Sequence, residues 1–160
     1  MPSSVKPIPD GYASAIPYLI VNGAAKAIDF YRKAFDATEL MRFPAPDGRI
    51  GHAELKIGNA LFMLADEHPE MGHREPRAVG GTPVSIMVYV PDVDALARAA
   101  QGAGAKIKRP LSDQFYGDRS CTLEDPFGHV WHFATHKEDV SGEEMQRRMA
   151  QMRKEPVGAA

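Results

Sequence analysis

Two residues that could carry acid–base chemistry alternate along one predicted strand. His52 and Glu54 are two positions apart, so their side chains project from the same face of the strand. Glu124, at the matching place in the second half of the chain, and His132 could join them. Imidazole and carboxylate groups act as general acids and bases and as ligands of divalent metals. The alternative is a solvated face of cross-strand ion pairs, with the basic partners Arg49, Lys56 and Arg119.

A loop that mixes aromatic and polar side chains leads into a strand of the second half. Residues 114–119 read Gln-Phe-Tyr-Gly-Asp-Arg. A loop of this kind at the rim of a cavity can stack on a ligand and hold its polar groups, which makes Tyr116 and Arg119 candidate ligand contacts. The same residues are equally compatible with a plain turn in which Asp118 pairs locally and Arg119 lies on the surface.

Composition and motifs argue against several other kinds of site. Cys121 is the only cysteine, which rules out an internal disulfide and a multi-cysteine metal centre. The chain has no Gly-x-Ser-x-Gly elbow and no Gly-rich phosphate loop. His68 and His73 lie near Glu67 and Glu70 in a stretch rich in Pro and Gly, where a metal would be held only loosely.

The charge and hydropathy pattern favours a cytoplasmic protein that binds neither nucleic acid nor membrane. The 160 residues carry a formal net charge of -2, whereas a nucleic-acid surface normally needs a basic stripe. No apolar run is long enough to span a bilayer. Residues 1–7 lack the hydrophobic core of a signal peptide.

The elements that would position these groups occur twice, about 70 residues apart. Residues 16–21 and 85–90 are apolar strands, each followed by an amphipathic helix and three further strands. A repeat of this length is one supersecondary unit used twice. We therefore expect an α+β fold of two tandem βαβββ modules forming a curved, cup-shaped mixed sheet with helices outside, plus a C-terminal helix. The expected divisions are an irregular lead-in over 1–13, modules over 14–66 and 84–136, a linker over 67–83 and a tail over 137–160.

The helix ends carry capping signals. Asn22 is expected to cap the first helix, and one face of that helix is apolar, comprising Ala24, Ile28, Tyr31 and Phe35. Asp92 is expected to cap the second helix, which Gly102 and Gly104 end.

The tail predicts a third helix. Ser141 and Glu144 have the spacing of a capping box. Met145, Met149 and Met152 follow at helical spacing on one face. We expect this face to dock on the body of the protein or on a second subunit.

Two short motifs in this arrangement carry a family resemblance. The first helix contains Ala27-Ile28-Asp29-Phe30-Tyr31, and Glu124-Asp125-Pro126-Phe127-Gly128-His129 precedes the last strand. Together with the paired modules they resemble the vicinal oxygen chelate superfamily, which contains glyoxalase I, bleomycin-resistance proteins, fosfomycin-resistance enzymes and extradiol dioxygenases. The chain most resembles the PhnB-like branch of glyoxalase-like proteins, over residues 14–140.

The resemblance implies where a metal centre would lie. Catalytic members hold one divalent metal in the cup with His, Gln and Glu side chains on the first and last strands of each module. Matching the helix and turn motifs places the four positions at Ile16, Phe62, Ser85 and His132. Only His132 is a competent ligand, and a catalytic metal usually needs three or more. The resemblance therefore implies that the usual metal centre is absent.

These observations leave three functions open. The first is a binding protein without a cofactor that holds a small organic ligand, aromatic or antibiotic-like, in the cup. The second is a lyase, isomerase or dioxygenase with one divalent metal such as Zn, Ni, Mn or Fe, in a relocated site that involves His52, Glu54, Glu124 or His132. The third is an interaction protein that uses the tail helix. The resemblance also implies a homodimer. The residues expected to line the cup and contact a ligand are Tyr18, Phe62, Leu64, Ser85, Met87, Tyr89, Tyr116, Arg119 and His132.

Overall fold

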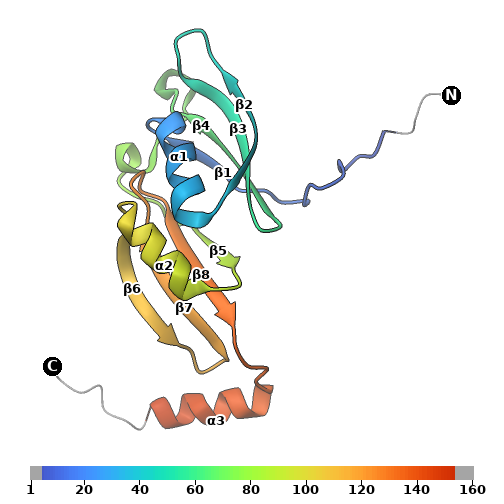
Figure 1. Cartoon of the computed structure of the whole chain (residues 1–160), viewed down its shortest axis with the longest axis vertical. Coiled ribbons are helices and arrows are strands. Elements are labelled where there is room, and N and C mark those ends of the chain that lie inside the picture. Colours follow the sequence, from blue (N-terminus) through green and yellow to red (C-terminus); the bar gives the residue numbers. More distant parts are fainter. Residues whose placement is uncertain (1–4, 154–160) are drawn as a thin grey trace.

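The structure, a computed structural model, describes residues 5–153. The first module comprises β1 (Tyr18–Val21), α1 (Ala24–Phe35), β2 (Thr38–Pro44), β3 (Ile50–Ile57) and β4 (Ala60–Asp66). The second comprises β5 (Ser85–Tyr89), α2 (Val93–Gly102), β6 (Lys106–Asp113), β7 (Asp118–Glu124) and β8 (Val130–His136). Two short 3₁₀ turns, Pro69–Met71 and Pro76–Val79, lie in the linker, and α3 (Gly142–Met152) follows the second module. The two βαβββ modules lie end to end along the longest axis (Figure 1).

The strands form two four-stranded mixed sheets rather than one curved sheet. Their orders are β1-β4-β3-β2 and β5-β8-β7-β6. In each sheet the first strand of the module runs parallel to the last, and the other neighbours are antiparallel. The predicted α+β class and tandem modules are confirmed. Each sheet packs one face on the helices. Within residues 5–153, no helix or second sheet covers the other face, called here the open face.

The register shows that the second module has a hairpin one residue longer than the first. Tyr18 pairs with Met63 in the first sheet, and Met87 pairs with His132 in the second. The neighbouring strands pair Glu54 with Met63 but Thr122 with His132. Because side chains alternate between faces, one extra residue changes which residues correspond. Met63, and not Phe62, therefore corresponds to His132. By the same register Thr122, and not Glu124, corresponds to Glu54.

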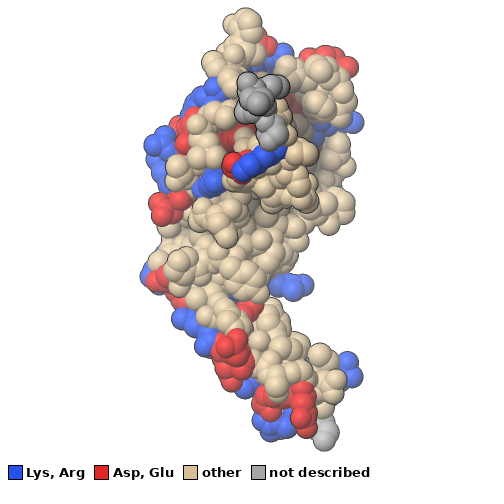
Figure 2. All heavy atoms as spheres, turned by 90° about the vertical axis from the view of Figure 1, so that its right-hand side faces the viewer, with Lys and Arg blue, Asp and Glu red and all other residues tan. Residues whose placement is uncertain are grey.

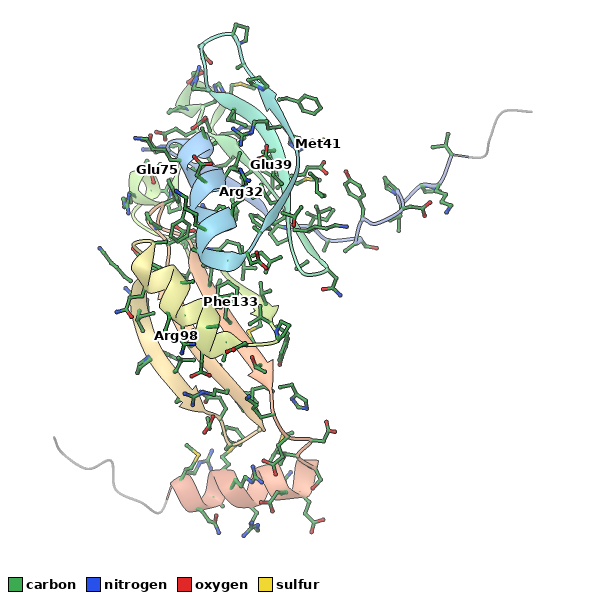
Figure 3. The ribbon with its side chains drawn as sticks, viewed as in Figure 1. Arg32, Glu39, Met41, Glu75, Arg98 and Phe133 are labelled. Atoms are coloured by element: carbon green, nitrogen blue, oxygen red, sulfur yellow. The ribbon has the colours of Figure 1, made fainter. Side chains whose placement is uncertain are left out.

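One aromatic layer joins the two modules. Phe35 of α1 packs on Trp131 and Phe133 of β8, with ring centroids 5.1 and 4.7 Å away. Phe62 of β4 lies 5.4 Å from Trp131, edge to face. All four side chains are almost completely buried, and Figure 3 labels Phe133 beside α2. The modules consequently share a single hydrophobic core.

Asp125 anchors this layer with a buried carboxylate that is 2% exposed. Its Oδ2 accepts hydrogen bonds from the Tyr31 hydroxyl at 2.7 Å and from Trp131 Nε1 at 2.9 Å. Its Oδ1 accepts from the backbone nitrogens of Phe127 and His129. Burial, followed by the charge of Asp125, raises the pKa of Tyr31 well above its usual value, so this phenol remains a donor. One carboxylate thus links α1 of the first module to a turn of the second.

Both module helices begin under a side chain from the last strand of the same module. Asp66 Oδ1 accepts from the backbone nitrogens of Gly23 and Ala24, both at 2.8 Å. At the corresponding place, Thr135 Oγ1 accepts from Val93 N at 2.9 Å. The predicted cap by Asn22 is wrong, because a carboxylate from β4 already satisfies these donors.

Other predicted features of the helices are confirmed in whole or in part. Asp92 caps α2 by accepting from Ala95 N. Ser141 caps α3, but Glu144 pairs with Arg147 and Arg148 instead of completing the capping box. Met149 and Met152 remain exposed, whereas Met145 is half-buried, so most of the methionine face does not dock on the described body. Its docking on a second subunit stays a prediction.

Parts of the lead-in and tail, residues 1–4 and 154–160, lie outside the described residues. Within residues 5–153, none of the helices has the length and apolar character that crossing a membrane would require.

Replacing Asp125 by Ala is expected to lower the free energy of unfolding by about 3 kcal/mol or more, because the buried Tyr31 and Trp131 donors lose their acceptor. Asp10→Asn is the control: Asp10 forms an exposed ion pair with Lys6, and its loss is expected to cost less than about 1 kcal/mol. Urea unfolding followed by tryptophan fluorescence measures both. Equal losses would show that Asp125 does not join the modules.

Candidate functional site

A hollow of about 400 Å³ lies on the open face of the second sheet. It brings together Met87 of β5, His132 of β8 and Tyr116 of the β6–β7 turn, three residues predicted to contact a ligand. The alternation of side chains along β5, β7 and β8 puts Met87, Thr122 and His132 in one row on this face. The other lining residues are Arg109, Pro110, Ser112, Gln114, Ser120, Cys121 and Thr122.

The walls of the hollow combine one cation with neutral polar groups. Arg109 contributes a guanidinium, and no carboxylate is among the described lining residues. His132 Nδ1 lies 2.8 Å from Thr122 Oγ1. Since this hydrogen bond uses one ring nitrogen, Nε2 is left to donate to or accept from a ligand. Cys121 is buried, and burial raises the pKa of its thiol, which makes it a poor nucleophile.

The turn that carries Tyr116 is fixed by Gly117. Gly117 has φ of +99°, and a Cβ at this position would overlap the carbonyl oxygen of Glu138. The carbonyl oxygen of Gly117 accepts from the backbone nitrogens of Lys137 and Glu138. The chain after β8 therefore packs directly on this turn and holds it at the edge of the hollow.

Arg119 does not reach the hollow. It alternates with Asp118 and Ser120 along β7 and pairs with Thr135, so it faces the helix side of the sheet. Its guanidinium holds Asp94 of α2 through Nε at 2.7 Å and Nη2 at 2.9 Å, and also contacts Asp113. The prediction that Arg119 lines the cup is wrong, because a carboxylate on α2 fixes it on the other face.

Tyr89 and Ser85 lie on the open face but outside the lining of the hollow. The Tyr89 hydroxyl donates to Asp118 Oδ2 at 2.7 Å, and His136 Nδ1 lies 2.7 Å from Oδ1. His136 Nε2 lies 2.9 Å from Asp139. Hydrogen bonds to these two carboxylates raise the pKa of His136. This cluster links the end of β8 to the segment before α3.

The first sheet carries another polar cluster on its open face. Tyr18 bonds to His52, and His52 and Tyr12 bond to Glu54. Glu54 is 5% exposed, so the expectation of a solvated face does not hold for it.

The positions predicted for Phe62 and Leu64 are wrong, because both pack beneath this sheet in the core. The alternation of faces excludes them from the open side.

The alternative metal ligands are not assembled. His52 and Glu54 lie on the first sheet, whereas Glu124 and His132 lie on the second, and Glu124 pairs with Lys108 at 3.2 Å. Among residues 5–153, no three His, Cys, Asp or Glu side chains are grouped in a way that could hold a metal ion. With the register corrected, the four family positions are Ile16, Met63, Ser85 and His132. These residues do not fit a divalent metal, which needs more than one good ligand.

Several lining residues were not singled out from the sequence. Ser120 and Thr122 could have been found, because they alternate with buried Cys121 and Leu123 along β7. Alternation along β6 does not predict the face of Arg109, because the pairing between β6 and β7 shifts register on both sides of it. His129, expected to have no special role, approaches Ile20 O with Nε2 at 2.9 Å and adds a link between the modules.

Comparison with known proteins identifies relatives over most of the chain. The family model described as Glyoxalase/Bleomycin resistance protein/Dioxygenase superfamily matches residues 12–133. An uncharacterized protein of Mycobacterium bovis is 47% identical over 137 residues, which cover 84% of this chain and 90% of that protein.

Solved structures share the fold. TioX from Micromonospora sp. ML1 is 29% identical with a TM-score of 0.62, and the match covers 81% of this chain and 100% of that one. Protein PA1353 from Pseudomonas aeruginosa is 25% identical with a TM-score of 0.63, covering 79% of this chain and 100% of that one.

Replacing Gly117 by Ala is expected to destabilise the protein by about 2 kcal/mol or more, because the new Cβ overlaps the backbone and the residue must keep a positive φ. Gly48→Ala is the matched control: Gly48 has φ of +85° but nothing within 4 Å of the added Cβ, so only about 1 kcal/mol is expected. Urea unfolding compares the two. Faster tryptic cleavage after Lys137 in Gly117→Ala alone would show release of the tail segment, and identical behaviour would contradict the packing argument.

Proposed function

The chain belongs to the glyoxalase/bleomycin resistance protein/dioxygenase superfamily, and from this premise we propose that it binds a small organic ligand in the hollow of the second sheet without the usual metal centre. The observation that carries the proposal is the composition of the hollow. Met87 and Tyr116 supply apolar and aromatic wall, while His132, Arg109 and the hydroxyl groups supply polar anchors. This combination is typical of small-molecule sites, and about 400 Å³ lies within their usual size.

The charges of the lining residues narrow the ligand class. A guanidinium without a carboxylate in the described lining favours a ligand with an acidic group, since Arg binds carboxylates and sulfonates through paired N–H donors. Tyr116 and Met87 favour a flat aromatic body. We therefore propose an aromatic or antibiotic-like acid as the ligand.

The residues at the family's metal positions support binding rather than metal chemistry. Ile16 and Met63 cannot supply the hard or borderline donors that Zn, Ni, Mn or Fe take in catalytic sites. Ser85 is exposed at the end of β5 and is a poor ligand. His132 therefore acts in the proposal as a hydrogen-bonding group for the ligand.

A fluorescence titration with 8-anilinonaphthalene-1-sulfonate tests the site, and N-phenyl-1-naphthylamine serves as the same aromatic body without the sulfonate. The acid is expected to bind about tenfold more tightly than the neutral compound, because it gains a charge-assisted contact with Arg109. Arg109→Gln is expected to remove this preference. Arg98→Gln is the control, since Figure 3 places Arg98 on α2, away from the hollow.

The metal-free part of the proposal has its own control. The titration is expected to be unchanged after dialysis against EDTA. Two results would contradict the proposal: one equivalent of Zn, Ni, Mn or Fe by elemental analysis that His132→Ala removes, or equal affinity of the two dyes for the wild-type protein.

We further propose that two copies form a homodimer that covers the open faces. Its support is apolar exposure: Tyr18, Phe43, Met87 and Tyr89 lie on the open faces with 46–60% of their surface exposed, and such patches mark interaction surfaces. Figure 2 shows a largely uncharged middle on the side toward which the N-terminal segment extends, with charged groups gathered toward the two ends. A second copy would bring another open face against it.

Sedimentation equilibrium tests this assembly. The wild-type protein is expected at about twice its chain mass of 17.5 kDa. Phe43→Glu is expected to shift it toward the monomer, because it places a charge in the buried interface. Met71→Glu is the control, since Met71 is 68% exposed in the linker. A measured mass of one chain for the wild-type protein at every protein concentration would contradict the proposed homodimer.

A further inference from the structure

The polar cluster on the first sheet is a continuous chain of hydrogen bonds. The Tyr18 hydroxyl lies 2.8 Å from His52 Nδ1, and His52 Nε2 lies 3.2 Å from Glu54 Oε1. The Tyr12 hydroxyl donates to Glu54 Oε2 at 2.6 Å. A phenol, an imidazole and a carboxylate therefore follow one another in order, and Tyr12 anchors the carboxylate.

The direction of the hydrogen bonds follows from the carboxylate. A carboxylate only accepts, so His52 Nε2 carries the hydrogen that it donates to Glu54. His52 Nδ1 then carries no hydrogen and accepts a hydrogen bond from the Tyr18 hydroxyl. Glu54 is buried, whereas the Tyr18 residue is 48% exposed, so the order runs from a buried carboxylate to a tyrosine at the surface.

We propose that Tyr18 is a nucleophile, activated by His52 and Glu54, that reacts with aromatic acyl and sulfonyl compounds. The order of groups is that of hydroxyl–imidazole–carboxylate triads on unrelated folds. Aromatic compounds are favoured because Phe43 lies beside His52, with ring centroids 6.1 Å apart, and is 59% exposed, which leaves aromatic surface next to the site. This site lies on the other sheet from the hollow and does not depend on the proposed ligand. Because the proposed homodimer would cover Tyr18 and Tyr89 alike, the reaction is assigned to the dissociated chain.

The reaction balances without a cofactor. Tyr18 Oη forms a bond to the electrophilic carbon or sulfur, and His52 Nδ1 takes the phenol proton. The bond to the leaving group breaks, and the leaving group departs with its electron pair. An aryloxide then takes the proton from His52, whereas fluoride leaves as the anion and the proton passes to solvent. The Glu54 carboxylate stabilises the imidazolium while it exists.

The base is needed because the phenol alone is a weak nucleophile. Burial, followed by the charge of Glu54, raises the pKa of Tyr18, so the hydroxyl stays protonated at neutral pH. Reaction at neutral pH therefore requires His52 to remove the phenol proton in the same step in which Tyr18 Oη attacks. An ordinary tyrosine reacts through its phenolate instead, which forms near pH 10.

Tyr89 provides a control within the same molecule. It is 60% exposed on the second sheet, and its hydroxyl donates to Asp118 rather than to an imidazole. That hydrogen bond, followed by burial, raises the pKa of Tyr89. A carboxylate is too weak a base to deprotonate a phenol, so Tyr89 is expected to react only as it ionises.

Labelling of the full chain with phenylmethanesulfonyl fluoride, at a protein concentration where sedimentation gives the mass of one chain, tests the proposal. The products are read by peptide mass spectrometry from pH 6 to 9. At pH 7.5 Tyr18 is expected to react at least about tenfold faster than Tyr89. The Tyr18 rate is expected to rise by less than about threefold from pH 7.5 to 9, because the reaction does not wait for the phenolate to form, whereas the Tyr89 rate keeps rising as its phenol ionises.

The variant Glu54→Gln shows whether Tyr18 reacts because His52 and Glu54 activate it or only because it is exposed. Its amide can donate to Nε2 and move the hydrogen to Nδ1, so the Tyr18 rate is expected to fall at least tenfold while the Tyr89 rate is unchanged. Tyr12→Phe leaves the three groups in place and is expected to keep the Tyr18 rate within about threefold. Measurements on the wild-type protein are enough to overturn the proposal. Equal rates for the two tyrosines would do so, and so would a Tyr18 rate that rises tenfold per pH unit to pH 9. An unchanged rate in folded Glu54→Gln would also overturn it.

Discussion

The buried carboxylate of Asp125 is the interaction on which the two-module arrangement depends. Its two oxygens collect four donors, from α1, from β8 and from the backbone of the turn between β7 and β8. An anion can be buried this deeply only if hydrogen bonds replace its water. Meeting this requirement places Tyr31 against Trp131, and the shared aromatic layer forms around the pair. Both open faces then lie on the side of the sheets away from that layer.

The repeat in the sequence was enough to predict the fold class, but not the face of every residue. Apolar periodicity identifies the strands and helices because burial is alternating in a strand and periodic in a helix. The second hairpin contains one extra residue in the turn that holds Asp125, and nothing in the repeat marks where it enters. A shift of one residue moves every side chain of a strand to the other face of the sheet. Matching the two halves therefore predicts Phe62 on the open side, although it lies in the core.

The candidate site was predictable where it depended on alternation and unpredictable where it depended on distant partners. Met87, Tyr116 and His132, predicted from their place on β5, β8 and the turn, line the same hollow. Arg119 was misplaced because its partner, Asp94, lies 25 residues away on α2. Likewise, the cap of α1 comes from Asp66 on β4. Hydrogen-bond partners that are distant in the sequence come together only when the helices pack on the sheets, so the local sequence pattern does not predict them.

The shared aromatic layer has a consequence for how this protein can change by descent. Here Phe35 and Phe62 come from one copy, while Trp131 and Phe133 come from the other, and they fill the same space. A volume change on one side must be matched on the other, because interiors are close-packed. Recombination that exchanges only one half would pair unmatched surfaces. The two halves therefore have to change together, although each has the βαβββ order of a complete module.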